Sequence, residues 1–548
     1  MDRRKFIKKA AAGSAAPFVL NNIPFNALAY DSPLMRMLAS SNSDRILVFL
    51  QMHGGNDGLN TIIPIKNYSK YYELRSNIAI PDFGSRKYIP LDDSLAEIER
   101  VGLHPDMTGI KQLYDSKRAS VIQSVGYENM NLSHFRSRDI WFMGGSYNQR
   151  IPSGWMGRFL DQDFPGYPDA YPNVSMPDPL GMEMGDDVTL AFMRENSIPA
   201  GISLQHPQEF YDLISSVGID PPTTVSFPDS HYGRELEYLS KFEQKTHDYA
   251  HRLKEVYDAG KNSENVTYPT AYPLLAPIPY VKNQLAEQFK IIARLISGGI
   301  KTRIFLTRIG GFDTHARQVE AVFPTQGRHA ALLYHISESV KAFHNDLQDQ
   351  GLGDKVITMT FSEFGRRVSS NASFGTDHGK AGPILMFGEG LKGGVYGENP
   401  DLEDLDNGNL KYQFDYRQVY TTVLSDWLGS TNAAIIDSGL GDFLSQKLDL
   451  VTNPLSVRTK TKPKMLELEC YPNPAKDRTK VDYTVPSGSK VKLCIYDSQG
   501  KMVATYVDKY QSGGKYEMEI KLSGLSSGNY IIKIETENNS ASKSLIIR

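Results

Sequence analysis

Cysteine and net charge are both scarce in this sequence. The 548 residues include two cysteines, Cys470 and Cys494, which excludes a disulfide scaffold and a cysteine-rich zinc module. Both lie near the C-terminus, so the rest of the chain has no thiol for nucleophilic attack or metal binding. Lysine and arginine number 60 against 63 aspartates and glutamates, and this net charge of −3 argues against a nucleic-acid-binding protein. Beyond the N-terminus no run of about 18 apolar residues occurs, so no transmembrane span is expected.

The N-terminus has the features of an export signal. Arg3 and Arg4 precede Phe6, a weakly apolar stretch follows, and residues 27–29 (Ala-Leu-Ala) have the small side chains of a cleavage site. This pattern resembles a twin-arginine signal peptide over residues 1–29. We therefore expect export into the periplasm and removal of this segment.

After residue 451 the chain changes character. Residues 452–464 combine prolines and basic residues without apolar periodicity, which predicts a linker. A series of short β-rich runs separated by turn residues then predicts a small all-β sandwich over residues 465–548. The expected strands are 480–485, 490–496, 502–507, 516–522 and 529–535.

Parts of this tail resemble a known sorting domain. Residues 471–475 (Tyr-Pro-Asn-Pro-Ala) and 525–530 (Leu-Ser-Ser-Gly-Asn-Tyr) are similar to the C-terminal sorting domain of the type IX secretion system. The resemblance implies a bacterium of the Bacteroidota, the secretion machinery as a partner, and a protein at the cell surface or outside the cell. A generic adhesive sandwich is the alternative. Export would permit a disulfide between Cys470 and Cys494, and the sequence leaves their pairing open.

The central region alternates between apolar strands and amphipathic helices. This order predicts an α/β domain over residues 44–450, with a mostly parallel sheet and helices on both faces. The less regular, proline-rich stretch of residues 145–280 is interpreted as an insertion or cap over the sheet edge that binds ligands. We expect strands at 45–51, 119–125, 302–308, 355–361 and 384–387, and helices at 94–116, 281–296, 327–347 and 416–427.

Polar residues gather next to the ends of these strands. Because ligands bind beyond the carboxyl ends of parallel strands, the loops that carry these residues are expected to meet at one edge. Carboxylates and imidazoles without thiols suit Zn²⁺, Mn²⁺ or a similar divalent ion. One Asp-x-His alone would fit a turn and a surface histidine, but five such loops favour a metal site. The loops are residues 52–60, 131–135, 310–315, 362–367 and 375–380.

Four motifs in these loops resemble one family. Residues 53–60 (His-Gly-Gly-Asn-Asp-Gly-Leu-Asn), 311–315 (Gly-Phe-Asp-Thr-His), 362–366 (Ser-Glu-Phe-Gly-Arg) and 376–379 (Thr-Asp-His-Gly) are similar to the domain-of-unknown-function family fifteen-oh-one. The resemblance covers about residues 46–428. The family is grouped with the alkaline phosphatase/sulfatase-like superfamily, and its own activity is not established. An alkaline phosphatase-like fold is therefore implied.

The superfamily pattern implies one or two metal ions. Asp377 either binds metal or only orients His378. The superfamily commonly has Asp-His where this chain has Glu363-Phe364, so the second ion lacks a ligand or has a substituted one. The metal ligands implied by the resemblance are Asp57, Asp313, His315, Glu363, Asp377 and His378.

The same pattern implies a nucleophile and an anionic ester substrate. Ser133 matches the superfamily's nucleophile at a helix start, with the alternative that it is only an N-cap. Asn131 is an expected substrate contact at this helix start. Arg366 and Lys380 would bind an anionic group, or else pair with structural carboxylates.

Roles are also expected for three further histidines. His53 is expected to hydrogen-bond the glycine loop and His104 to precede a helical turn, whereas His134 either acts as a base for Ser133 or points elsewhere.

Two classes of function agree with these predictions. The first is an exported, metal-dependent hydrolase of phosphate or sulfate esters. The alternative is a non-catalytic cell-surface protein that retains the fold. A formylglycine sulfatase is disfavoured because the Cys/Ser-x-Pro-x-Arg context is missing.

Overall fold

The computed structural model describes residues 18–20, 23–25, 44–164, 166–168, 171–173, 176–195, 198–216, 249–452, 467–485, 489–497, 501–511, 514–536 and 540–548. The chain divides into two compact units, Met1–Arg458 and Thr459–Arg548, and each is described by itself. The predicted signal peptide lies outside the described residues except for β1 (Phe18–Leu20) and β2 (Ile23–Phe25), which pair with each other. The predicted linker lies outside them beyond residue 452.

The large unit is built on a nine-stranded sheet. Its strand order is β13-β7-β12-β11-β3-β10-β8-β9, with β14 also paired to β7. Strand β12 runs antiparallel to both neighbours and the remaining pairs are parallel, which confirms the mostly parallel sheet. The strands are β3 (Ile46–His53), β7 (Ala119–Gly126), β8 (Gly181–Met184), β9 (Ile202–Leu204), β10 (Ile304–Gly310), β11 (Val356–Phe361), β12 (Gly382–Phe387), β13 (Gly394–Tyr396) and β14 (Phe414–Asp415).

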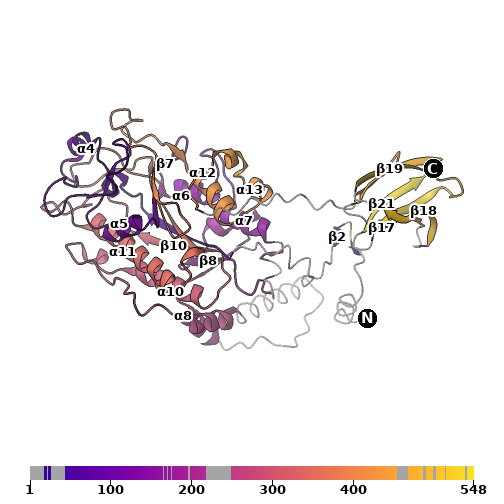
Figure 1. Cartoon of the computed structure of the whole chain (residues 1–548), viewed down its shortest axis with the longest axis horizontal. Coiled ribbons are helices and arrows are strands. Elements are labelled where there is room, and N and C mark those ends of the chain that lie inside the picture. Colours follow the sequence, from indigo (N-terminus) through magenta and orange to yellow (C-terminus); the bar gives the residue numbers. More distant parts are fainter. Residues whose placement is uncertain are drawn as a thin grey trace. The chain divides into compact units, whose positions relative to one another are not determined.

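Helices cover both faces of this sheet, as Figure 1 shows. Side chains alternate along β3, so Val48 and Leu50 enter one apolar core while Leu47 and Phe49 enter the other. The first core includes α5 (Thr108–Asp115), α10 (Gln284–Ser297) and α11 (Arg328–Asp349). The second includes α6 (His134–Met143), α7 (Trp155–Asp163), α12 (Tyr416–Thr422) with its π-helical continuation Val423–Trp427, and α13 (Asn432–Asp437).

Smaller elements complete this unit. A three-stranded sheet pairs β6 with both β4 and β5. The elements are β4 (Ile62–Pro64), β5 (Ile89–Pro90), β6 (Val101–Leu103), α3 (Gly58–Thr61), α4 (Tyr68–Arg75), α8 (Pro207–Ser216) and the 3₁₀ turns Leu190–Phe192, Ile278–Tyr280, Gly353–Lys355 and Gly441–Gln446. Within the described residues, no helix combines the length and apolar character needed to cross a membrane.

Two predicted segments differ from the structure. The stretch predicted as one helix over residues 94–116 contains β6 followed by α5, because three residues of strand are too short to show a period. The stretch predicted as a cap over residues 145–280 supplies β8 and β9 to the main sheet itself. The four residues of β8 are all buried beside β10, and tertiary pairing rather than local alternation makes them a strand.

The small unit forms two antiparallel sheets, which confirms the all-β sandwich. One has the order β15-β16-β19 and the other β18-β17-β20-β21. Cys470 on β15 and Cys494 on β17 are both buried and free, so the pairing left open by the sequence is absent. The strands are β15 (Glu467–Tyr471), β16 (Arg478–Val485), β17 (Ser489–Tyr496), β18 (Met502–Gln511), β19 (Gly514–Lys521), β20 (Gly528–Glu535) and β21 (Ser540–Ile547).

Candidate metal centre

Three neighbouring parallel strands deliver the first site residues. In the pairing of β10 with β3, Gly310 lies opposite His53, and in the pairing of β11 with β3, Phe361 lies opposite Gln51. The strands therefore end side by side, and the loops that follow them begin at the same edge of the sheet. Seven side chains from the strand ends, loops and helix start at this edge form what we call the strand-end cluster: His53, His134, Asp313, His315, Glu363, Asp377 and His378.

A glycine allows two of these loops to touch. Gly54 has a φ of +123°, and a Cβ atom there would lie 2.3 Å from the backbone nitrogen of Asp313. The Phe312 N–H donates to the His53 carbonyl oxygen at 3.1 Å. Since any larger residue would push the Asp313 loop away, the glycine of the His-Gly-Gly motif is needed for this close approach.

Asp313 lies at the middle of the cluster. One potential ligand atom from each of His134, Asp313 and His378 lies within 4.8 Å of the others. The Nε2 atoms of His134 and His378 are 3.6 and 3.4 Å from the Asp313 carboxylate oxygens. The Arg366 guanidinium donates to Asp313 Oδ1 at 2.9 Å, and although burial opposes ionisation, Arg366 keeps the pKa of Asp313 below its usual value.

Two imidazoles face each other through nitrogen atoms that both have lone pairs. His378 Nδ1 lies 2.8 Å from the Leu132 carbonyl oxygen, which can only accept, so Nδ1 carries the proton. His315 Nδ1 is placed the same way, 3.2 Å from Asp377 Oδ1. The two Nε2 atoms are therefore unprotonated in the neutral rings, yet they are 2.9 Å apart. A shared cation or proton is needed to offset the repulsion between these lone pairs.

Glu363 places a buried carboxylate next to His134 and His53. Its side chain is 0% exposed, and its Oε1 accepts from the Gly54 N–H at 2.8 Å and lies 3.1 Å from His134 Nδ1 and 3.4 Å from His53 Nδ1. Its Oε2 has no hydrogen-bond partner among the described residues. Burial opposes ionisation, but the His134 hydrogen bond, His53 and the Gly54 N–H keep the pKa of Glu363 below its usual value. A buried, ionised oxygen without a donor fits a positive ion.

The remaining pKa shifts leave the cluster ready to bind a cation. Burial lowers the pKa of His53 and of His378, so both rings are neutral at pH 7. The His315 hydrogen bond lowers the pKa of Asp377, which is ionised. Neutral imidazoles and ionised carboxylates are the protonation states that metal binding requires. The Nε2 atoms of His134, His315 and His378 lie 3.6, 3.3 and 3.4 Å from the Asp313 carboxylate oxygens, and this set of donors fits a divalent ion.

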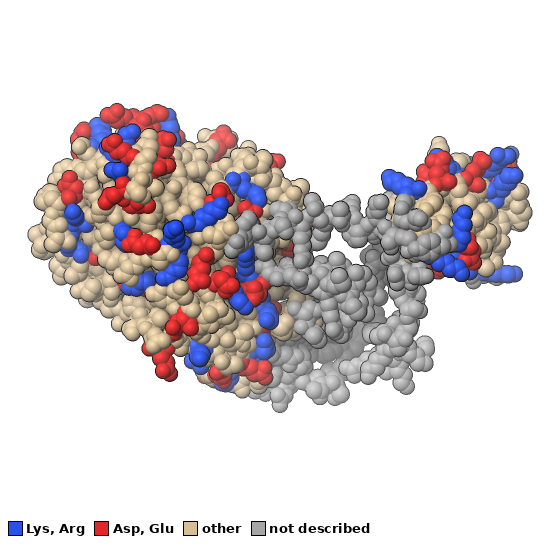
Figure 2. Space-filling view, in the orientation of Figure 1, with Lys and Arg blue, Asp and Glu red and all other residues tan. Residues whose placement is uncertain are grey.

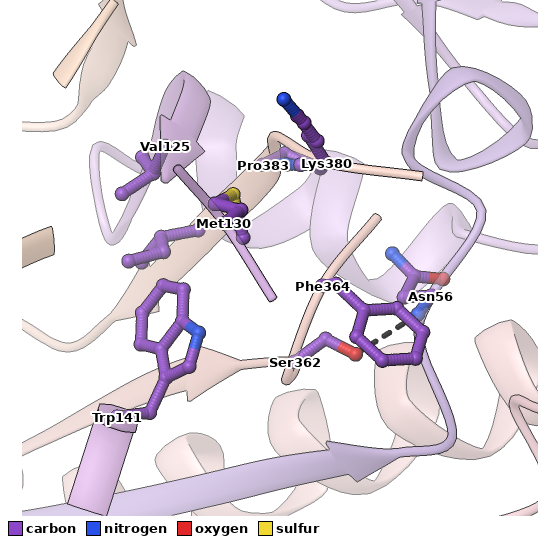
Figure 3. A pocket seen from close by; sticks show the side chains of 10 residues that line it. Asn56, Val125, Met130, Trp141, Ser362, Phe364, Lys380 and Pro383 are labelled. Atoms are coloured by element: carbon purple, nitrogen blue, oxygen red, sulfur yellow. Dashed lines mark hydrogen bonds between the residues drawn. The ribbon is translucent and has the colours of Figure 1, made fainter. Parts of the chain in front are cut away.

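Behind the aromatic ring that packs on the cluster there is only a small cavity. Phe364 packs against the rings of His134 and His378, at centroid distances of 4.9 and 4.4 Å, and also lines a cavity. Figure 3 shows Phe364 and Asn56 on one side of this cavity and Trp141 and Met130 on the other. Its volume of about 10 Å³ is room for one water. A larger ligand must therefore reach the cluster from the solvent side, where the side chain of Asp313 is 46% exposed.

Ser133 lies beside this cluster at the start of α6. Its side chain is exposed and makes no N-cap hydrogen bond, so the N-cap alternative is not realised in its side chain. The side-chain oxygen of Asn131, predicted to contact substrate, accepts from the Ser133 backbone N–H at 2.9 Å. This turn fixes the backbone that precedes His134.

The two predicted substrate cations are engaged elsewhere. Arg366 has a side chain that is 0% exposed and donates to the carbonyl oxygens of Gly54, Gly55, Phe312 and Thr376 as well as to Asp313. Lys380 forms an ion pair with Asp406. The alternative that these cations pair with structural groups therefore describes both residues.

Asp57, the first metal ligand expected from the sequence, is not brought into the cluster. Its side chain is 1% exposed, and both carboxylate oxygens accept from Arg75 Nη1 at 2.8 Å. Oδ2 also accepts from Gln318 at 2.6 Å. With Arg75 fully buried beside it, the Asp57 carboxylate neutralises an internal charge.

Two residues of the strand-end cluster were not predicted from the sequence to belong to a metal centre. His53 was expected only to hydrogen-bond the glycine loop, and His134 was expected either to act as a base for Ser133 or to point elsewhere, yet both lie within 3.4 Å of Glu363 Oε1. The signals were present in the first position of the His-Gly-Gly motif and in the residue after Ser133. His104 is buried and its Nδ1 accepts from the Asp106 N–H at 3.2 Å, so it is a structural histidine.

Each of the two units matches the model of a known family. Residues 44–427 match the model of the family described as "Protein of unknown function (DUF1501)". The chain belongs to this family. Residues 469–548 match the "Secretion system C-terminal sorting domain". This sorting domain marks the DUF1501 protein for export or the cell surface by the type IX secretion machinery. No curated protein matches the chain.

Several solved structures are distantly similar to this DUF1501 protein. The PsFucS1 sulfatase from Pseudoalteromonas sp. has 11% identity and a TM-score of 0.30, with 90% of this chain and 88% of that chain covered. A protein in the alkaline phosphatase superfamily from Vibrio parahaemolyticus has 11% identity and a TM-score of 0.31, covering 93% and 92%. Dimeric latent PorU from Porphyromonas gingivalis has 20% identity and a TM-score of 0.13, covering 15% and 9%.

Proposed function

We propose that this protein is an exported, metal-dependent hydrolase of phosphate or sulfate esters. The observation that carries the proposal is the pair of Nε2 atoms of His315 and His378, which lie 2.9 Å apart and 3.3 and 3.4 Å from Asp313 Oδ1. Two unprotonated imidazole nitrogens at this distance repel each other unless a cation or a proton lies between them. His134 and Asp313 complete a set of nitrogen and oxygen donors that suits Zn²⁺ or Mn²⁺.

The proposed chemistry divides between the ion and the chain. A bound divalent ion supplies charge stabilisation for an ester group that becomes more negative during transfer. Ser133 is the proposed nucleophile because its hydroxyl is exposed, has no capping bond, and precedes His134 of the cluster. Asn131 holds the Ser133 backbone in place through its side-chain oxygen. The sorting domain takes the enzyme to esters outside the cell.

The test measures metal and turnover together. The purified protein is equilibrated with Zn²⁺ or Mn²⁺, desalted, analysed for metal, and assayed with chromogenic phosphate and sulfate monoesters. We expect at least one bound ion and turnover that disappears with chelator and falls by orders of magnitude in Ser133→Ala. Ser85→Ala, at another exposed serine of the large unit, is the matched control and should behave as the wild type. Metal-independent turnover, or equal turnover in both variants, would reject the mechanism.

A second candidate is a metal-containing surface protein without hydrolytic activity. The observation that favours it is that Arg366 and Lys380 already pair with the carboxylates of Asp313 and Asp406, which leaves neither cation unpaired for an anionic ester. This candidate predicts the same metal content with no turnover of any ester in the panel. The two candidates are therefore separated by the assay and not by the metal analysis.

A further inference from the structure

A buried amide connects the two loops that provide most of the cluster. Gln318 is fully buried, and its Oε1 accepts from the hydroxyls of Thr314 and Thr376, each at 2.9 Å. Thr314 lies between Asp313 and His315, and Thr376 directly precedes Asp377 and His378. One oxygen atom thus holds the centre of one ligand loop and the start of the other.

Asp57 determines which way this amide points. Gln318 Nε2 lies 2.6 Å from Asp57 Oδ2, and an ionised carboxylate can only accept, so the amide nitrogen must face it. Burial opposes ionisation of Asp57, but the buried Arg75 outweighs it and keeps the pKa of Asp57 below its usual value. The amide oxygen is therefore turned to the two threonine hydroxyls, which can both donate to it.

The geometry points to Gln318 as a positioning residue for the metal centre, oriented by the buried Asp57–Arg75 pair. This inference rests on the proposed function, since it concerns how the same ligands are held. The backbone supports it independently, because the Thr376 N–H donates to the Thr314 carbonyl oxygen at 3.0 Å and brings the loops together. Asp57 is then neither a ligand nor a passive core residue, because it acts on the ligands through Gln318.

The experiment compares Zn²⁺ affinity in the full-length protein by calorimetry. Gln318→Met keeps the length of the side chain and removes both hydrogen-bonding atoms. Loss of a partner that orients metal ligands typically weakens metal affinity about 10- to 100-fold, and we expect a loss in this range. The double variant Thr314→Val, Thr376→Val should lose affinity to a similar degree. Adding Gln318→Met to it should cost little more, because all three groups act in one chain of contacts.

The matched control is Thr302→Val. Thr302 is also fully buried and donates its hydroxyl to the Pro179 carbonyl oxygen at 2.6 Å, but it precedes β10, at the opposite end of that strand from the cluster. Thr302→Val should lower the melting temperature of the metal-free protein as the other threonine variants do, while Zn²⁺ affinity stays within about 2-fold of the wild type. A purely structural role of Gln318 would give this same pattern.

Each outcome decides the inference. Wild-type affinity in Gln318→Met, or an equal loss in Thr302→Val, overturns the positioning role and leaves the proposed function standing. A wild-type protein that binds neither Zn²⁺ nor Mn²⁺ overturns both. Should Gln318→Met fail to fold, the threonine double variant against Thr302→Val makes the same comparison.

Discussion

Replacement of Arg366 by lysine should reduce stability and not substrate affinity. The Arg366 guanidinium donates to the carbonyl oxygens of Gly54, Gly55, Phe312 and Thr376 and to Asp313 Oδ1. Lysine has three donors on one nitrogen, so at least one of the four buried carbonyl oxygens loses its partner, while Asp313, with a side chain 46% exposed, can turn to water. Each buried acceptor left without a donor costs about 1–3 kcal/mol, which predicts a loss of at least about 1–3 kcal/mol.

Urea unfolding followed by tryptophan fluorescence measures this loss in the large unit alone. All three tryptophans, Trp141, Trp155 and Trp427, are buried in that unit, so tryptophan fluorescence does not report unfolding of the sorting domain. Arg367→Lys is the control, because Arg367 is exposed and its side chain donates to the Asn407 carbonyl oxygen at 3.1 Å. An unchanged midpoint in Arg366→Lys together with a raised KM for an anionic ester would contradict the reasoning and restore Arg366 as a substrate contact.

Three further outcomes follow from the structure. Burial on α11 lowers the pKa of His344 to about 3, so the unfolded chain takes up a proton below about pH 6.5 while the folded chain does not. Between pH 7 and about pH 4.5 the wild type should therefore lose roughly 3 kcal/mol more stability than His344→Gln, and equal losses in urea unfolding would refute the assignment. Ser133→Ala should leave the free energy of unfolding in urea within about 0.5 kcal/mol of the wild type, because no capping bond is lost, whereas a loss of about 1 kcal/mol would restore the N-cap interpretation. Intact-mass analysis of the cell-surface form should show loss of about 30 N-terminal residues and of a tail of about 80, and a surface form of 61.3 kDa would contradict the predicted processing.

The main sheet was predictable because its central strands are continuous apolar runs next to glycine-rich loops. Every residue of β3 except His53 is buried, which is typical of a strand covered by helices on both faces. Strand β8 was not predictable, since its four residues include Glu183 and owe their position to pairing with β10. In the sorting domain β15 and β21 were missed, because β15 has only five residues and closely follows the expected linker, and β21 begins with Ser-Ala-Ser-Lys-Ser, which lacks β-branched and aromatic residues.

The site was predictable as a set of loops and less so residue by residue. Strand topology dictates that loops after β3, β10 and β11 begin side by side, and the structure places their side chains together. Sequence spacing does not reveal that Arg75 reaches Asp57, nor that Arg366 turns inward to four carbonyl oxygens. These are long-range contacts of buried charges, for which no local pattern exists. The roles of the cluster residues stay predictions.

Figure 2 shows basic and acidic side chains interspersed over the visible face of the large unit, which gives that face no uniformly basic surface for nucleic acid. Recognition by this protein is therefore expected to depend on the strand-end cluster and its open side, where the side chains of Asp313 and His315 are 46% and 48% exposed. The metal content of that cluster is the property on which the proposed function, and the positioning role of Gln318, both depend.

Metal analysis of the wild type against His378→Ala tests this property most directly. Both proteins are saturated with Zn²⁺, desalted and measured by elemental analysis, with His251→Ala, at an exposed histidine outside the cluster, as the matched control. The wild type and His251→Ala should retain at least one ion per chain, and His378→Ala should retain much less, because it removes a nitrogen donor that faces both Asp313 and His315. A wild type without metal, or equal metal in all three proteins, would contradict the metal centre.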